Sequence, residues 1–111
     1  MALTITSSEA NGWLIIEVVG QVDSKTAGDL KDYLDGNVAG SLPVALELTA
    51  VPFMSSAGLR ALLTLHRQTE SMGVALALVG LKEEIADTMR VTGFYQYFTV
   101  YSGSHELPAA N

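Results

Sequence analysis

The chain has 111 residues, of which 49% are hydrophobic and 16% are charged, and its formal net charge is -6. This is the size of one domain with one core, and the composition is too apolar for a disordered chain. The excess of acid disfavours binding to nucleic acid or to anionic lipid, because both present negative charge. The lack of cysteine excludes disulfides and thiol chemistry. With no recognisable signal peptide and no apolar run of membrane-spanning length, we expect a cytoplasmic protein that binds no membrane.

The first third of the chain predicts a β-hairpin followed by a helix. Residues 3–7 alternate between apolar and polar side chains, and residues 13–19 form a β-branched, apolar run. Asn11-Gly12 lies between them and is typical of a hairpin turn, because both residues tolerate positive φ. After the N-cap candidates Asp23 and Ser24, apolar residues recur at helical spacing over 27–38.

The rest of the chain alternates between strands and helices. We expect a strand over 44–48 that is covered on both faces, since only Glu47 interrupts its apolar run. A helix follows, capped by Ser55 or Ser56 and ended by Gly73. A strand over 74–79, a helix over 82–91 and a short strand over 98–101 complete the pattern. Residues 102–111 are expected to form a flexible tail.

The predicted order of elements is β-β-α-β-α-β-α-β. This order is typical of an α/β fold with a mostly parallel sheet and right-handed crossovers. The opening hairpin adds an antiparallel strand at the N-terminal edge of that sheet. We therefore expect residues 1–111 to form a single domain, with a core that spans about 3–101.

The sequence contains little that would support catalysis. Its two histidines, His66 and His105, do not occur at the spacing of a metal site. The segment from Gly20 to Asp23 stands where a phosphate-binding loop could occur. It lacks the further glycines of a dinucleotide fingerprint and the lysine of a P-loop. We therefore expect no enzyme activity, no metal and no cofactor.

Two adjacent serines, Ser55 and Ser56, stand where a buried strand has ended and a helix begins. The first N–H groups of a helix lack intrahelical acceptors, so its N-terminus tolerates a phosphate. A phosphoserine there would add about -1.5 to -2 charge to the surface and disturb a docked partner. Serine is also a favoured N-cap residue, which by itself accounts for a serine at this position.

The segment around these serines contains Glu47-Leu48, then Phe53-Met54, then Ser55-Ser56-Ala57-Gly58-Leu59. This segment resembles the signature of the STAS-domain anti-sigma-factor antagonists. The family's Gly-x-x-Asp loop before the first helix is matched by Gly20-Gln21-Val22-Asp23. Further matches are Gly73-Val74 and Thr92-Gly93-Phe94. The likeness covers roughly residues 3–101 and implies a STAS-type α/β domain.

The resemblance implies a regulatory role without catalysis. In this family an anti-sigma factor that is itself a serine kinase phosphorylates the serine matched here by Ser56. The unphosphorylated antagonist binds the kinase and frees a sigma factor, and a metal-dependent serine phosphatase of the PP2C type reverses the modification. The partner contacts that the resemblance implies are Asp23, Ser24, Met54, Ser55, Gly58 and Leu59.

Two positions depart from the family's pattern, and two other roles stay open. The family usually has Asp directly before the phosphorylated serine, where this chain has Ser55, and Asp where this chain has Glu47. Ser55 is therefore an alternative phosphorylation site. The same fold also serves as an accessory subunit of lipid or solute transporters. A small α/β enzyme is the third possibility, because fold does not dictate function.

Overall fold

The alternating residues at the start of the chain build a hairpin at one edge of a five-stranded sheet. The computed structural model describes residues 3–110. Strand β1 (Thr4–Ala10) pairs antiparallel with β2 (Trp13–Val19). The turn between them has Asn11 and Gly12 at φ 58° and 85°, the left-handed conformation expected of this pair.

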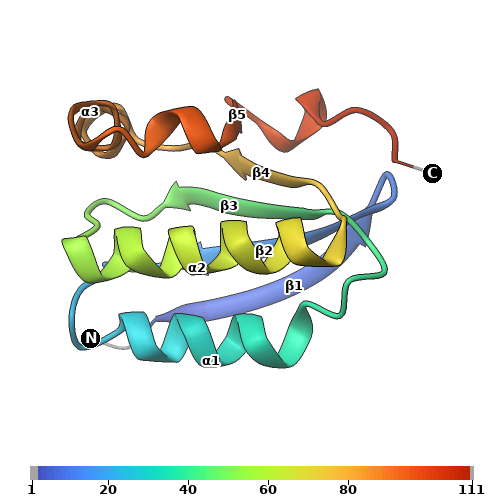
Figure 1. Cartoon of the computed structure of the whole chain (residues 1–111), viewed down its shortest axis with the longest axis horizontal. Coiled ribbons are helices and arrows are strands. Elements are labelled where there is room, and N and C mark those ends of the chain that lie inside the picture. Colours follow the sequence, from blue (N-terminus) through green and yellow to red (C-terminus); the bar gives the residue numbers. More distant parts are fainter. Residues whose placement is uncertain (1–2, 111) are drawn as a thin grey trace.

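Three crossovers then add parallel strands in sequence order, so the sheet runs β1-β2-β3-β4-β5 (Figure 1). The added strands are β3 (Val44–Ala50), β4 (Leu76–Val79) and β5 (Thr99–Tyr101). The connecting helices are α1 (Ala27–Asn37), α2 (Ser56–Met72) and α3 (Glu83–Thr92). Two 3₁₀ turns, η1 (Tyr95–Tyr97) and η2 (Ser104–Glu106), flank β5. The predicted α/β class and β-β-α-β-α-β-α-β order are confirmed.

All three helices contribute to one apolar cluster on a single face of the sheet. Leu30 of α1, Leu62 of α2 and Met89 of α3 are fully buried there against inward-facing strand residues such as Ile16 and Leu46. The burial of this apolar cluster is the main stabilising contribution to the fold. Within residues 3–110, no helix has the length and hydropathy that crossing a membrane requires.

The opposite face of the sheet is covered by the C-terminal segment, which corrects the expectation of a flexible tail. Leu107 is buried in a second cluster with Trp13, Ala45 and neighbouring β4 residues. The indole Nε1 of Trp13 donates to the carbonyl of Pro108 at 2.7 Å, and Ala110 N–H donates to the carbonyl of Asn11 at 3.0 Å. The segment lies beside the hairpin because an exposed Trp13 and sheet face would leave apolar area in water.

The C-terminal segment covers only part of this face of the sheet. On β3 the outward residue Ala45 is buried, Glu47 is half-buried and Thr49 is exposed. The prediction that residues 44–48 are covered on both faces is therefore confirmed at Ala45 and met only in part at Glu47, and the exposed Thr49 lies beyond the predicted range. On that face the carboxyl ends of β2 and β3 are left open to solvent at Val19 and Thr49, whereas Val79 at the end of β4 is buried.

Candidate functional site

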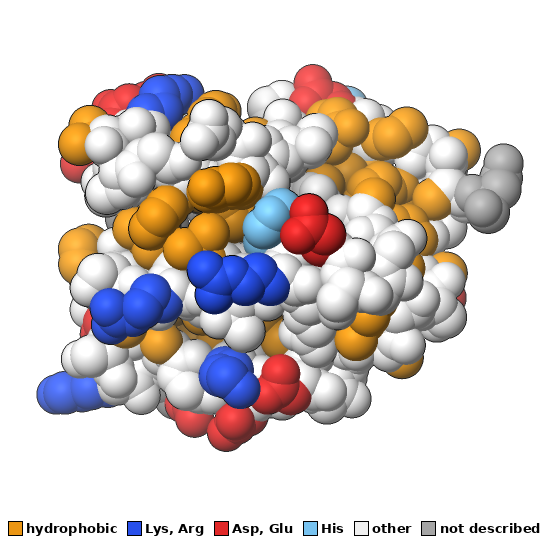
Figure 2. All heavy atoms as spheres, viewed as in Figure 1, with side chains coloured by type: hydrophobic (Ala, Val, Ile, Leu, Met, Phe, Trp, Pro, Cys, Tyr) orange, Lys and Arg blue, Asp and Glu red, His pale blue; other side chains and the backbone are white. Residues whose placement is uncertain are grey.

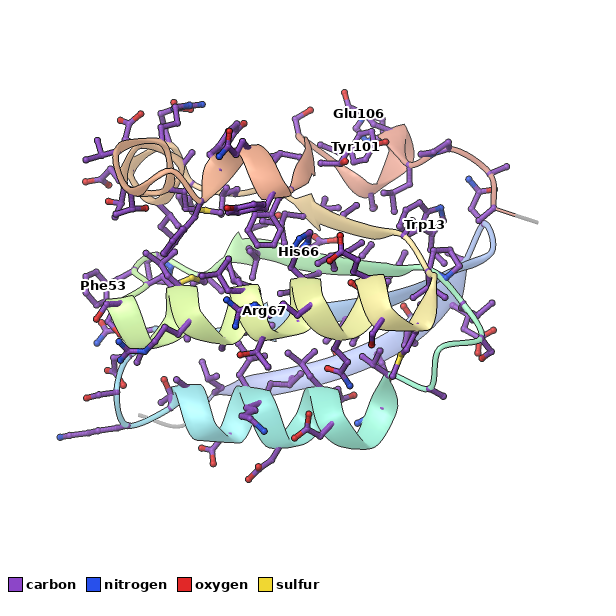
Figure 3. The ribbon with its side chains drawn as sticks, in the orientation of Figure 1. Trp13, Phe53, His66, Arg67, Tyr101 and Glu106 are labelled. Carbon is purple, nitrogen blue, oxygen red and sulfur yellow. The ribbon has the colours of Figure 1, made fainter. Side chains whose placement is uncertain are left out.

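Ser56 lies at the edge of the sheet where the parallel strands end, as the first residue of α2. The connection from β3 turns there through Pro52 and Phe53. Figure 3 shows Phe53 at the end of the molecule where α2 begins, far from Trp13 and Glu106. Phe53 is 49% exposed and is one of several large apolar residues at the surface. The site is therefore well separated from the C-terminal segment.

The two segments that carry the predicted motifs lie side by side. Val22 N–H donates to the carbonyl of Phe53 at 3.0 Å, and Ser55 N–H donates to the carbonyl of Val22 at 2.8 Å. Val22 and Met54 thereby form an isolated parallel bridge beyond the ends of β2 and β3. This pairing brings the loop that contains Asp23 next to the start of α2.

Gly58 allows the first turn of α2 to pack closely on this bridge. A Cβ atom at position 58 would lie 2.5 Å from Cγ of Met54 and 2.8 Å from Cγ1 of Val22. Separations this short are not found between real side chains, and Val22 is fully buried and cannot move aside. Glycine is therefore required by space at this position.

The two serines occupy different environments. Ser55 is the N-cap residue of α2, yet its hydroxyl makes no capping hydrogen bond. Its Oγ has less than 1 Å² exposed to solvent and no hydrogen-bond partner among residues 3–110. Ser56 is exposed, and the first turn of α2 contains no acidic residue. The accessible side chain thus lies where the helix dipole is positive and where the first turn of the helix itself supplies no carboxylate.

The carboxylate of Asp23 is used to fold its own loop. Its Oδ1 accepts from the N–H groups of Lys25 at 2.9 Å and Thr26 at 3.2 Å, and its Oδ2 accepts from the side chain of Gln21 at 2.9 Å. These hydrogen bonds, that of Gln21 first, hold the pKa of Asp23 below its ordinary value of 3.8. The loop they form delays the start of α1, whose N-cap is Thr26 rather than Asp23 or Ser24.

The remaining predicted contact residues differ in what they present to solvent. Ser24 is exposed, whereas Met54 and Leu59 are 7% and 5% exposed and Gly58 is buried. These three buried residues lie beneath the surface of the site and support it. Sequence reasoning missed the exposure of Phe53 and did not single out Arg60, which is exposed one turn after Ser56. The four-residue spacing between Ser56 and Arg60, which places two side chains on the same side of a helix, could have indicated that Arg60 lies near Ser56.

A groove of about 230 Å³ borders the site on the side of α3. It is lined by Pro52, Phe53, Met54, Glu84, Ile85 and Thr88. On the other side, Lys and Arg side chains lie over α1 and α2 together with the acidic side chains of α1 (Figure 2). Ser56 therefore lies between an apolar groove with one acidic wall and a helical layer that carries charges of both signs. Among residues 3–110, no three His, Asp or Glu side chains are grouped to hold a metal ion.

Comparison with known proteins extends the resemblance to nearly the whole chain. The family model described as "STAS domain" matches residues 4–107. A Bordetella bronchiseptica protein named "Putative anti-sigma factor antagonist BtrV" is 32% identical over 109 residues, which cover 97% of this chain and 93% of that protein.

Solved structures share the fold at lower sequence identity. An anti-sigma factor antagonist from Mycobacterium paratuberculosis superposes with a TM-score of 0.83 at 24% identity, covering 94% of this chain and 89% of that one. The Bacillus cell fate determinant SpoIIAA in its phosphorylated form gives 0.70 at 13% identity, covering 93% and 95%. Because the family model matches residues 4–107, this chain belongs to the STAS domain family.

Proposed function

We propose that this chain is an anti-sigma factor antagonist that acts by binding its partner and catalyses no reaction. The proposal is supported by the name of the 32% identical relative and by the fold shared with named antagonists. The observation that carries it is the exposed hydroxyl of Ser56 at the first residue of α2, beside the loop of Asp23. The partner is an anti-sigma factor, and the site of action is the cytoplasm.

Binding is switched off by phosphorylation of Ser56. The anti-sigma factor acts as a serine kinase and transfers the terminal phosphoryl group of ATP to Oγ of Ser56, with release of ADP and the hydroxyl proton. The new group adds about -1.5 to -2 charge next to the helix N-terminus, which accommodates it without unfolding. A kinase docked on the same surface would have to desolvate that charge, so the complex dissociates. A PP2C-type serine phosphatase restores the binding form.

The phosphate acceptor is Ser56 and not its neighbour. A kinase must bring the γ-phosphate within bonding distance of the serine oxygen, and Oγ of Ser55 has less than 1 Å² of exposed surface. The backbone N–H of Ser55 also donates to the carbonyl of Val22. Exposing the Ser55 side chain would therefore require local unfolding. Ser56 needs no such rearrangement.

The docking surface includes Ser56, the adjoining loop and the groove beside Phe53. Ser24 and Phe53 are exposed next to Ser56, and the groove beside Phe53 can accept an apolar side chain from the partner. Met54, Gly58 and Leu59 hold the surface in place from below. A half-exposed aromatic residue next to a pocket is a common anchor in protein interfaces.

The experiment is calorimetric titration of the cognate anti-sigma factor with matched serine variants. We expect Ser56→Ala to bind like the unmodified protein and to stay bound after incubation with ATP. We expect Ser56→Asp to bind at least tenfold more weakly, because it places a carboxylate at the interface. Ser55→Ala is the control and should be phosphorylated and released normally. Equal binding by Ser56→Ala and Ser56→Asp, or phosphate on the Ser56→Ala protein, would contradict the proposal.

A further inference from the structure

Arg60 lies one helical turn after Ser56 on the exposed side of α2. Residues four apart on a helix are neighbours on its surface, and both of these residues are exposed. The ion pairs among residues 3–110 join Lys31 to Asp35 and Arg90 to Glu83 and Asp87. Arg60 takes part in none of them, so its guanidinium has no carboxylate partner within the described chain.

The surroundings of Arg60 on α2 contain no competing acid. The residues three and four positions away from it are Ser56, Ala57, Leu63 and Thr64, and none of them carries a charge. The first turn of the helix also lacks an acidic residue. An anion bound to Ser56 would therefore be the nearest negative charge along the helix.

The direction of helical side chains favours this pairing. Cα–Cβ bonds in an α-helix tilt toward the N-terminus, so a long side chain at position 60 leans back over the turn that contains position 56. An acid four residues before a base is the more favourable of the two possible orders. The planar guanidinium of arginine offers two N–H donors that match two phosphate oxygens.

We propose that Arg60 pairs with the phosphate on Ser56 and holds it against the first turn of α2. This inference rests on the proposed phosphorylation of Ser56. Phosphorylation then changes the docking surface in two ways. It adds a dianion at Ser56, and it engages the guanidinium of Arg60, which is then no longer free to pair with a carboxylate of the partner. Arg60 is a positioning residue of the phosphorylated form and is not needed for the fold.

The test uses protein with phosphoserine incorporated at position 56 during synthesis, so that no kinase is required. The phosphorus NMR signal is followed through a pH titration in the parent protein, in Arg60→Ala and in Arg67→Ala. A nearby guanidinium favours the dianion and lowers the second pKa of the phosphate. We expect Arg60→Ala to raise the titration midpoint by a few tenths of a pH unit. Arg67 lies on the same helix seven residues further on, and its removal should leave the midpoint unchanged.

The outcomes separate this inference from the proposed function. Equal midpoints in all three proteins would overturn the pairing, and so would a shift produced by Lys25→Ala in place of Arg60→Ala. Arg60→Lys should retain part of the effect, because charge remains but the two-donor geometry is lost. A circular dichroism spectrum like the parent's confirms that each variant is folded. Whether the cognate kinase modifies Ser56 is measured separately on unmodified protein, and its failure would contradict only the proposed function.

Discussion

At the scale of single residues, Gly58 controls how closely α2 approaches the bridge between Val22 and Met54. Its neighbours leave no room for a Cβ atom, and the closest contacts would be side-chain carbons at 2.5 and 2.8 Å. The same glycine brings the exposed Ser56 next to the loop of Asp23. One small residue therefore determines both local packing and the geometry of the proposed docking surface.

We predict that Gly58→Ala lowers the free energy of unfolding by about 1–3 kcal/mol, the usual cost of overpacking a core. Urea denaturation measures the change. Gly28→Ala is the matched control, because Gly28 also lies in the first turn of a helix but has no atom within 4 Å of the added Cβ. The control should be neutral or stabilising by about 0.5 kcal/mol. Equal stability of the two variants would contradict the close approach described for Gly58.

At the scale of elements, the C-terminal segment acts as a cover for one half of the outer sheet face. Leu107 is 4% exposed, and it packs with Trp13 and Ala45 on a face that no helix reaches. Glu106 supports the turn before Leu107, since its Oε1 accepts from the hydroxyl of Ser102 at 2.9 Å and from its N–H at 2.8 Å. The segment is thus held by both apolar and polar contacts.

We predict that Leu107→Ala destabilises the protein by about 2 kcal/mol, the lower end of the range for a buried leucine, because the cluster is small. Trp13 is the single tryptophan, so its fluorescence reports directly on this cover. The emission maximum should move to longer wavelength as water reaches the indole. His105→Ala, an exposed residue of the same segment, should leave both stability and emission unchanged. An unshifted spectrum for Leu107→Ala would show that the segment does not cover Trp13.

At the scale of the whole molecule, the sheet is shared by two apolar clusters of unequal size. The larger lies beneath α1, α2 and α3, and the smaller lies beneath the C-terminal segment. Both use the same strands, because successive side chains of β2, β3 and β4 point to opposite faces. Losing the sheet would therefore remove both clusters together.

We predict that the two clusters unfold in one transition. Far-ultraviolet circular dichroism follows the three helices, and Trp13 fluorescence follows the smaller cluster. The midpoints of the two urea curves should coincide, as expected for a single domain of this length. A fluorescence transition at clearly lower urea concentration would indicate that the C-terminal segment detaches before the sheet unfolds.

Much of the fold could be predicted from local sequence patterns. The alternation before Asn11-Gly12 predicted the hairpin, and the helical spacing after the two serines predicted α2, with Ser55 or Ser56 as its cap. The start of α1 was placed too early, because a capping residue such as Asp23 can serve a loop as well as a helix. The tail was misjudged because Leu107 is the one large apolar residue in 102–110, and no periodicity accompanies it.

The sequence by itself determined the order of the elements, the parallel sheet and the resemblance around Ser56, since each depends on residues that are close together in the chain. Only the tertiary structure decided which of the two serines is exposed, that Gly58 has no room for a side chain, and that Leu107 covers Trp13. These features depend on contacts between segments that are distant in sequence or on the space between packed elements. Solvent exposure is a property of the packed molecule, and a local pattern does not specify it.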